Sequence, residues 1–147
     1  DLFIESRKKK GIWGFKEPRT LLVFSGWLPV LPNWVGVGIF RDPREVVMSM
    51  QARNGFDLAK GFEIWRIYNQ ALLSLHRRFD VPVIEFRTDA EQMHSCISRL
   101  VAHVGLASPP NPKFYDAAIP RHAGLGSGIA VPPDVSHLLE ELREAAW

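Results

Sequence analysis

The sequence predicts an α/β fold in which a parallel sheet lies between two layers of helices. Short apolar segments rich in β-branched residues alternate with longer segments whose apolar residues recur every three or four positions. These are the patterns of strands and helices respectively. Strands that alternate with helices are joined by right-handed crossovers, which makes their sheet parallel. The 147 residues are the length of one ordinary domain, so we expect a single three-layer α/β/α domain over residues 1–147.

The first expected elements are short. Residues 2–10 have the composition of the last turns of a helix, with three lysines near its carbonyl end and Gly11 as its stop. Ile12–Phe15 is a short strand candidate. Thr20–Leu31 is strongly apolar and ends in a proline-containing stretch, so we expect a buried helix there.

The stretch Val35–Phe40 is a continuous apolar run, the pattern of a strand covered on both faces. A helix is expected next, over Pro43–Arg53. Asp42 suits the N-cap of this helix, proline is favoured at its first position, and Glu45 completes a D-x-x-E capping box. Arg41 is therefore expected at the exit of the strand, directly before a well-defined helix start.

A long amphipathic helix is expected over Asp57–Phe79, followed by a strand over Val81–Arg87. The apolar residues of the helix form one continuous stripe, which we assign to the core, although such a stripe also suits the wall of a ligand pocket. The stripe consists of Leu58, Phe62, Trp65, Tyr68, Leu72, Leu75 and Phe79.

Three further segments complete the chain. Thr88 and Glu91 form a capping box for a helix that runs to Val104. Ala107–Pro133 is rich in Pro, Gly and Ser, which predicts a long loop, and loops of this length are usually functional or mobile. Asp134–Ala146 has the pattern of a last amphipathic helix. Its inward-facing residues are expected to be Val135, Leu138, Leu139 and Leu142.

Composition excludes several classes of protein. The formal net charge of +2 is too small to predict a nucleic-acid partner, and no apolar run is long enough to span a membrane. A single cysteine, Cys96, rules out an internal disulfide, and the histidines lack a metal-binding spacing. We therefore expect no metal site. Because the sequence shows no signal peptide, we expect a cytoplasmic protein.

Two basic residues stand at the carboxyl ends of predicted strands, where ligands bind in parallel α/β sheets. These residues are Lys16 and Arg41. Ser49 lies almost two helical turns after Asp42 and faces the same way as that cap, so a phosphate there would receive hydrogen bonds from both Arg41 and Ser49. The alternatives are a salt bridge of Arg41 with Asp42 or Glu45, and a solvent-facing or back-bonded Ser49.

The stretch "GIFRDPREVVMSM" resembles the segment of PAPS-dependent sulfotransferases that binds the 3′-phosphate of the nucleotide donor. In that family an apolar strand ends in an arginine, and a serine follows eight residues later. Arg41 and Ser49 match this spacing. The stretch "WGFKEPRT" is similar to the "KDP" strand end of many bacterial members, and "NGFDLAKGFEIWRIYNQALL" is similar to their "W…YN" helix.

The resemblance continues in "VPVIEFRTDAEQMHSCISRLVAHVGL", which is similar to the late strand and helix of the family. Here Ile84 and Glu85 replace the usual "YE" pair. The resemblance covers roughly residues 12–106. It implies a P-loop NTPase-like sulfotransferase fold, without a metal, that transfers a sulfuryl group from PAPS to a hydroxyl or amine acceptor and releases PAP.

The resemblance also implies roles for four residues. Arg41 and Ser49 would hold the 3′-phosphate. Lys16 would contact the sulfuryl group and neutralise the charge that develops on the bridging oxygen as the nucleotide leaves; its alternative is a surface lysine at a strand end. Arg121, in "RHAGLGSG", would be a further phosphate contact, and the alternative for this stretch is a flexible loop.

The amino-terminal strand and glycine-rich phosphosulfate loop of the family match no segment of the sequence, so we expect the first βα unit to be absent. One explanation is that the chain is a fragment of a full sulfotransferase. Another is that it is a non-catalytic, PAP-binding remnant or an interaction module that forms a homodimer through an unpaired sheet edge. A third is a different phosphate-handling P-loop relative, such as a small kinase. The sequence marks neither the acceptor nor the catalytic base.

Overall fold

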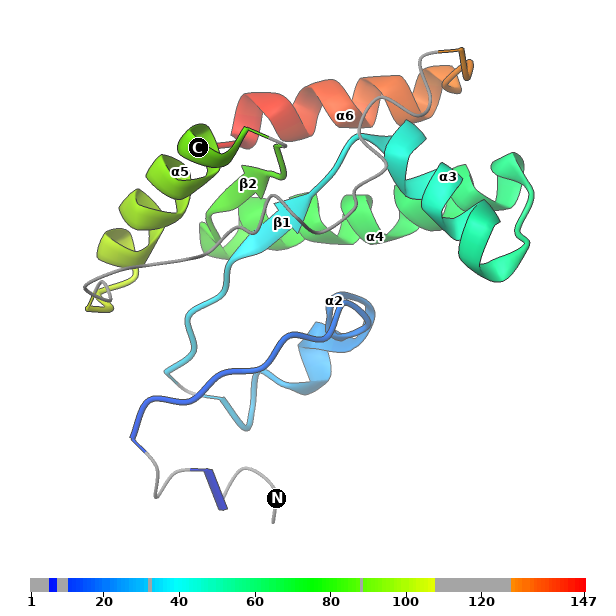
Figure 1. The fold of residues 1–147 in the computed structure, drawn as a ribbon. Coiled ribbons are helices and arrows are strands. Elements are labelled where there is room, and N and C mark those ends of the chain that lie inside the picture. Colours follow the sequence, from blue (N-terminus) through cyan, green and yellow to red (C-terminus); the bar gives the residue numbers. More distant parts are fainter. Residues whose placement is uncertain (1–5, 8–10, 32, 88, 108–127) are drawn as a thin grey trace. The chain divides into compact units, whose positions relative to one another are not determined.

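The computed structural model describes residues 6–7, 11–31, 33–87, 89–107 and 128–147 (Figure 1). The chain divides into two compact units, Asp1–Val35 and Gly36–Trp147, and each is described here by itself. The described residues combine helices with a small two-stranded parallel sheet, as expected of the α/β class.

The first unit contains only short elements among its described residues. Helix α2 covers Thr20–Val23 and is followed directly by the 3₁₀ helix η1, Phe24–Gly26. The prediction of one buried helix over Thr20–Leu31 is therefore wrong. Turns follow η1, and none of the described residues of this unit is buried. The helix expected over residues 2–10 falls largely outside the described residues.

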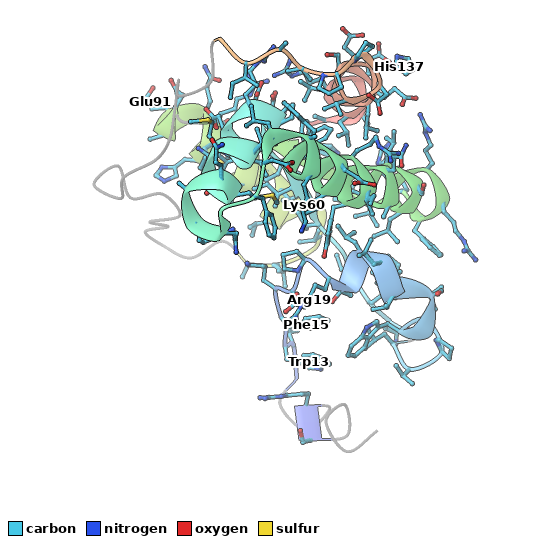
Figure 2. The ribbon with its side chains drawn as sticks, turned by 90° about the vertical axis from the view of Figure 1, so that its right-hand side faces the viewer. Trp13, Phe15, Arg19, Lys60, Glu91 and His137 are labelled. Carbon is cyan, nitrogen blue, oxygen red and sulfur yellow. The ribbon has the colours of Figure 1, made fainter. Side chains whose placement is uncertain are left out.

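The strand predicted over Ile12–Phe15 is also wrong, because these residues pair with no strand among the described residues. The rings of Trp13 and Phe15, both labelled in Figure 2, stack on each other instead, and Phe15 also contacts Trp27. The ring centroids of Trp13 and Phe15 are 6.1 Å apart, and those of Phe15 and Trp27 are 5.5 Å apart. These contacts join residues close in sequence, so this stretch gains aromatic packing without a sheet partner.

The second unit contains the sheet. Strands β1 (Gly38–Phe40) and β2 (Val83–Glu85) are parallel, and Ile39 pairs with Ile84 in the middle of the register. On the other edge of β2, Val83 forms a parallel bridge with Ala146. The parallel arrangement confirms that the predicted strands are joined by helical crossovers, although both strands are shorter than expected.

The described part of the second unit contains four helices, and their positions along the chain confirm the predicted pattern to within a few residues (Figure 1). The N-caps predicted at Asp42 and Asp57 are observed, each with its carboxylate accepting a backbone N–H. The capping box predicted from Thr88 is not confirmed, because Thr88 lies outside the described residues and Asp89 is the N-cap. The helices are α3 (Pro43–Asn54), α4 (Leu58–Phe79), α5 (Ala90–His103) and α6 (Pro133–Ala145).

The core of the second unit lies where α4 and α6 pack together against β1 and β2. All four residues predicted to face inward from α6 are buried in this core. The predicted stripe of α4 is confirmed only in part: Phe62, Trp65 and Leu72 are buried, the other four residues are half-buried, and Asn69 and Leu73 beside the stripe are buried as well. Gly38 of β1 lies directly against Leu72 of α4, so the strand and the helix approach closely. The most deeply buried side chains are Val47, Leu72, Val83, Val135 and Leu142.

Among the described residues of the second unit, the second face of β1 is exposed, which corrects the prediction that this strand is covered on both faces. Gly38 and Phe40 are buried, whereas Ile39 between them is 55% exposed and the preceding Val37 is 47% exposed. Side chains alternate between the two faces of a strand, so only one face of β1 contacts the core. An apolar run shows that the side chains on both faces of a strand are suited to burial. It does not show whether helices are present to cover the second face.

Two remaining expectations concern the loop and the membrane. Most of the loop predicted over Ala107–Pro133 lies outside the described residues, and α6 begins at Pro133 rather than Asp134. Among the helices that the structure describes, none combines the length and the apolar character needed to cross a bilayer.

Candidate functional site

Arg41 lies where β1 ends and α3 begins, as the sequence predicts. Asp42 accepts a hydrogen bond from the backbone N–H of Arg44 at 2.9 Å, and Pro43 occupies the first turn of the helix. The indole N–H of Trp65, from α4, donates to the Arg41 carbonyl at 2.9 Å. Because Trp65 is itself buried, this bond holds the Arg41 backbone against the core.

The Arg41 side chain takes the ion-pair alternative with Glu45. Its Nε donates a hydrogen bond to the Glu45 carboxylate, four residues along the chain. The expected capping box is therefore not closed by Glu45, whose carboxylate binds the arginine side chain. The Cζ atom of Arg41 lies 4.9 Å from the centroid of the Phe86 ring, a cation–π arrangement.

One donor group of Arg41 remains available. Its Nη2 atom is buried and has no hydrogen-bond partner within the described residues. A guanidinium carries five N–H donors, so the bond to Glu45 leaves capacity for another acceptor. The structure thus shows the salt-bridge alternative for Arg41, whose Nη2 atom has no acceptor among the described residues.

Ser49 lies on α3 and is half-buried, and no hydrogen bond of its hydroxyl is observed among the described residues. The positions of Arg41, Glu45 and Ser49 are each four residues apart. Residues with this spacing share one side of a helix, and the Arg41–Glu45 ion pair confirms it for the first two. The Glu45 carboxylate therefore comes between the two predicted phosphate ligands along this side.

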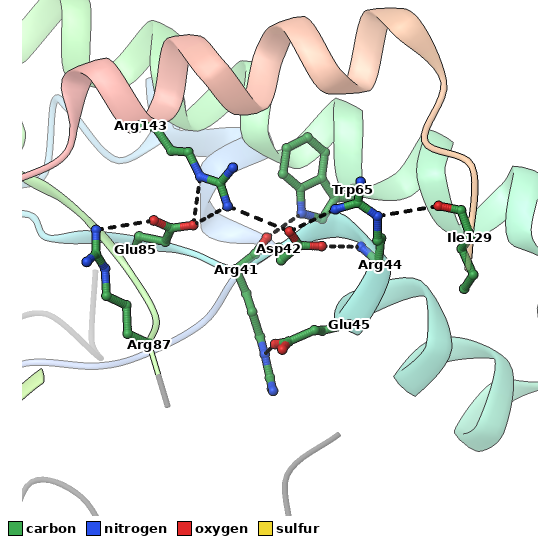
Figure 3. A network of polar contacts seen from close by, with 9 residues as sticks. All are labelled: Arg41, Asp42, Arg44, Glu45, Trp65, Glu85, Arg87, Ile129 and Arg143. Atoms are coloured by element: carbon green, nitrogen blue, oxygen red, sulfur yellow. Dashed lines mark hydrogen bonds and ion pairs between the residues drawn. The ribbon is translucent and has the colours of Figure 1, made fainter. Parts of the chain in front are cut away.

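A network of charges joins the carboxyl ends of both strands (Figure 3). Arg143, from the last turn of α6, donates to Glu85 at 2.8 and 2.9 Å and lies 3.6 Å from Asp42. The Arg44 side chain contacts the same oxygen of Asp42, Oδ2, at 3.3 Å, and Arg87 contacts Glu85 at 3.6 Å. Asp42 thus caps α3 while its side chain also contacts Arg44 of the same helix and Arg143 of α6.

Arg44, Arg87 and Arg143 were not predicted as members of this network. Arg143 falls within the last predicted helix, and nothing in the sequence connects that helix to Asp42 or Glu85. Arg87 was expected only as the last residue of a strand. The ion pairs between these groups depend on how α6 lies against β2, which local patterns do not report.

A hollow of about 430 Å³ opens beside the end of β2, but neither Arg41 nor Ser49 lines it. Its walls come from the end of β2, from α5 and from the last residue of the chain. Arg87 and Arg99 give it positive charge, and Glu85 and Glu91 give it negative charge. Cys96 is a half-buried free thiol on this wall.

The other two predicted site residues lie elsewhere. Lys16 is an exposed residue of the first unit and does not end a strand, which corrects the sequence prediction. Beside it, Glu17 accepts hydrogen bonds from the side chain of Arg19 at 2.8 Å, and these bonds lower the pKa of the Glu17 carboxyl to about 2. Arg121 lies outside the described residues.

Comparisons of the chain with models of protein families, with curated proteins and with solved structures find no match in any of the three.

Proposed function

We propose that the carboxyl end of β1 binds a phosphate group through Arg41 and Ser49. The observation that carries this proposal is the buried Nη2 atom of Arg41, which lacks a partner within the described residues. A buried donor without a partner destabilises a protein by about 1–3 kcal/mol. An anion at this atom would remove that penalty, and phosphate oxygens match the planar fork of a guanidinium.

The position of Arg41 in the fold supports the same proposal. It follows a parallel strand and immediately precedes the amino-terminal end of α3. Ligands of α/β proteins bind at the carboxyl ends of parallel strands, and the amino-terminal ends of helices favour anions. Trp65 fixes the backbone of Arg41 at this place, while the guanidinium itself is paired with Glu45.

We further propose that the phosphate is the 3′-phosphate of PAPS or PAP and that the chain belongs to a sulfotransferase with a P-loop-type α/β/α fold. The resemblance of "GIFRDPREVVMSM" to the 3′-phosphate segment of that family supports this step. In the proposed reaction, an acceptor oxygen or nitrogen attacks the sulfur in line and a new bond forms. The bond from sulfur to the bridging oxygen of the nucleotide breaks, and PAP leaves with that electron pair.

Within this reaction, Lys16 would stabilise the negative charge that appears on the bridging oxygen of PAP. Arg121 would add a contact to the nucleotide. The low pKa of Glu17 makes this neighbouring carboxylate a weak base, so it is not assigned the acceptor proton. The sulfuryl transfer is proposed for a protein that combines this chain with a phosphosulfate-binding loop.

Calorimetric titration with PAP and with adenosine 5′-monophosphate tests the phosphate site. The two ligands differ in the 3′-phosphate, so Arg41→Ala is expected to weaken PAP binding at least tenfold and to leave the affinity for the monophosphate unchanged. Ser49→Ala removes one uncharged donor and is expected to have a smaller effect on PAP. Arg53→Ala changes the same charge at an exposed position of α3 and serves as the matched control.

Equal PAP affinities of the wild-type chain and Arg41→Ala would contradict the proposed site. An equal loss of affinity for both ligands would show that Arg41 acts on a part of the nucleotide other than the 3′-phosphate, which also contradicts it.

A second candidate is a non-catalytic module that forms a homodimer. The observation that favours it is the open face of β1, where Val37 and Ile39 are exposed. Within the described residues, β1 also pairs along one edge only, with β2. A strand that is exposed in this way is a template for pairing with another chain.

Sedimentation velocity separates this candidate from the first. A module that dimerises through β1 should become monomeric when Ile39→Lys places a charge on the open face. A chain that sediments as a monomer at micromolar concentration, with or without this substitution, would contradict the module.

A further inference from the structure

In the described structure, the Arg41 side chain forms an ion pair with Glu45. Its carboxylate accepts a hydrogen bond from Arg41 Nε, and the exposed fractions of the two side chains are 26% for Arg41 and 19% for Glu45. The ring of Phe86 lies close to the guanidinium as well. A charge pair that is shielded from water in this way is screened by salt less than an exposed pair. The Glu45 carboxylate therefore interacts strongly with any anion that binds at the Arg41 guanidinium.

The spacing of the residues places Glu45 beside any anion that Arg41 and Ser49 share. Arg41, Glu45 and Ser49 follow one another at intervals of four residues, and the ion pair shows that the first two side chains meet. A phosphate held by both Arg41 and Ser49 therefore comes next to a carboxylate. Two negative groups at short range repel each other, and both of them require the same guanidinium.

We infer that the Glu45 carboxylate is a built-in competitor of the anion at Arg41. This inference rests on the proposed function and assigns to Glu45 a role in selectivity. In the part of the chain that the structure describes, Glu45 orients the guanidinium through Nε, and Nη2 has no partner there. A carboxylate brings one negative charge, whereas a phosphate monoester brings up to two and more acceptor oxygens.

Competition of this kind sets a threshold for binding. A dianionic phosphate monoester, such as the 3′-phosphate of PAP, gains enough from Arg41 to bind in spite of Glu45. An anion with a single charge gains less and is excluded. Glu45 thus acts as a specificity-determining residue without itself donating a hydrogen bond to the ligand.

The substitution Glu45→Gln removes the charge and keeps a side-chain oxygen that can accept from Arg41 Nε. It is expected to tighten PAP binding by about three- to tenfold, since it removes the repulsion at short range. Glu140→Gln is the matched control, because it makes the same charge change at an exposed position of α6. Calorimetric titration with PAP measures all three proteins, and their melting temperatures show whether each is folded.

A second measurement needs no variant. Adding PAP to the wild-type chain must displace or weaken the Glu45 contact, so the NMR resonance of the Arg41 Nε–H group is expected to shift. A resonance that stays in place at saturating PAP would contradict the inference.

The outcomes separate this inference from the proposed function. If Arg41→Ala weakens PAP binding while Glu45→Gln binds with wild-type or lower affinity, the phosphate site stands and the role of Glu45 is wrong. If none of the proteins binds PAP, the proposed function fails and the inference fails with it. A gain for Glu140→Gln equal to that of Glu45→Gln would reduce the effect to overall charge and would also contradict the role of Glu45.

Discussion

The two units of this protein differ in how far they bury their apolar residues. Within the described part of the first unit no residue is buried, and Ile12, Leu22 and Val23 are each at least 48% exposed. In the second unit, α6 buries its complete apolar stripe and α4 buries Phe62, Trp65 and Leu72, next to a two-stranded sheet. Both units contain strongly apolar segments, so apolar composition alone does not decide which of them forms a core.

The difference follows from the lengths and patterns of the elements. Helix α4 has 22 residues and repeats its apolar positions over the full length, which lets it contact α3, α6 and β1 together. Helix α2 has four residues and is too short to present such a stripe. A long periodic element brings distant segments together, whereas the first unit is described by contacts between residues close in sequence, such as those of Phe15.

The largest expected effect in this comparison comes from truncating one leucine in each unit. Leu142, on α6, is fully buried, so Leu142→Ala is expected to lower the free energy of unfolding by about 2–5 kcal/mol. Leu22, in α2, is 48% exposed, so Leu22→Ala is expected to change it by about 0.5 kcal/mol or less. Urea unfolding followed by circular dichroism measures both variants. Losses of similar size would show that the first unit also has a core.

A smaller effect is expected from adding one methyl group at a glycine. A Cβ atom at Gly38 would lie 2.4 Å from Leu72 Cδ1, so the leucine must move and Gly38→Ala is expected to destabilise the second unit by about 1–3 kcal/mol. Gly14, in the first unit, has no atom within 4 Å of that position. Gly14→Ala is expected to leave stability unchanged or to raise it by up to about 1 kcal/mol, since alanine restricts the unfolded chain. The same unfolding experiment compares them, and equal costs would contradict the close approach of β1 and α4.

The smallest expected effect concerns the titration of Glu17. Hydrogen bonds from the Arg19 side chain lower the pKa of Glu17 from 4.5 to about 2, and NMR titration of the Glu17 carboxyl is expected to report this shift. Arg19→Ala should return the pKa toward 4.5. The folded-state pKa lies below the unfolded value, so the contribution of this pair to stability is present above about pH 4.5 and is lost as the pH falls to about 2.

Both members of that pair are open to solvent, with exposed side-chain fractions of 79% for Arg19 and 39% for Glu17. The shift is therefore expected to shrink in high salt. A pKa of Glu17 that is independent of salt would indicate that the first unit shields the pair more than the described structure shows, which would weaken the contrast between the two units.

The helices of the second unit could be predicted because their signals are local. Asp42 and Asp57 are the N-caps of α3 and α4, and Gly55 and Gly105 have the positive φ angles that are common just after a helix. The apolar residues of α4 and α6 recur with the helical period. The same local signals predicted the place of Arg41 between a strand and a helix. Each of these features depends on a few neighbouring residues, so the sequence contains the information.

The partners of the site residues could not be predicted in this way. The spacing of four residues allows Arg41 to pair with Glu45, and it also allows both to flank an anion with Ser49. The contacts of Asp42 and Glu85 with Arg143 join segments that are far apart in the chain. Such contacts depend on the packing of α6 beside β2, which sequence patterns do not encode residue by residue.

By itself, the sequence determined where the helices of the second unit begin and end, because caps and apolar periods act over one or two turns. Only the tertiary structure decided that Ile39 is exposed, that Arg41 is held by Glu45 and Trp65, and that Arg143 joins the ends of both strands. Burial and ion pairing depend on which surfaces meet in space. Apolar residues on both faces of a strand make either face suitable for burial. Their pattern alone does not determine which face another element will cover.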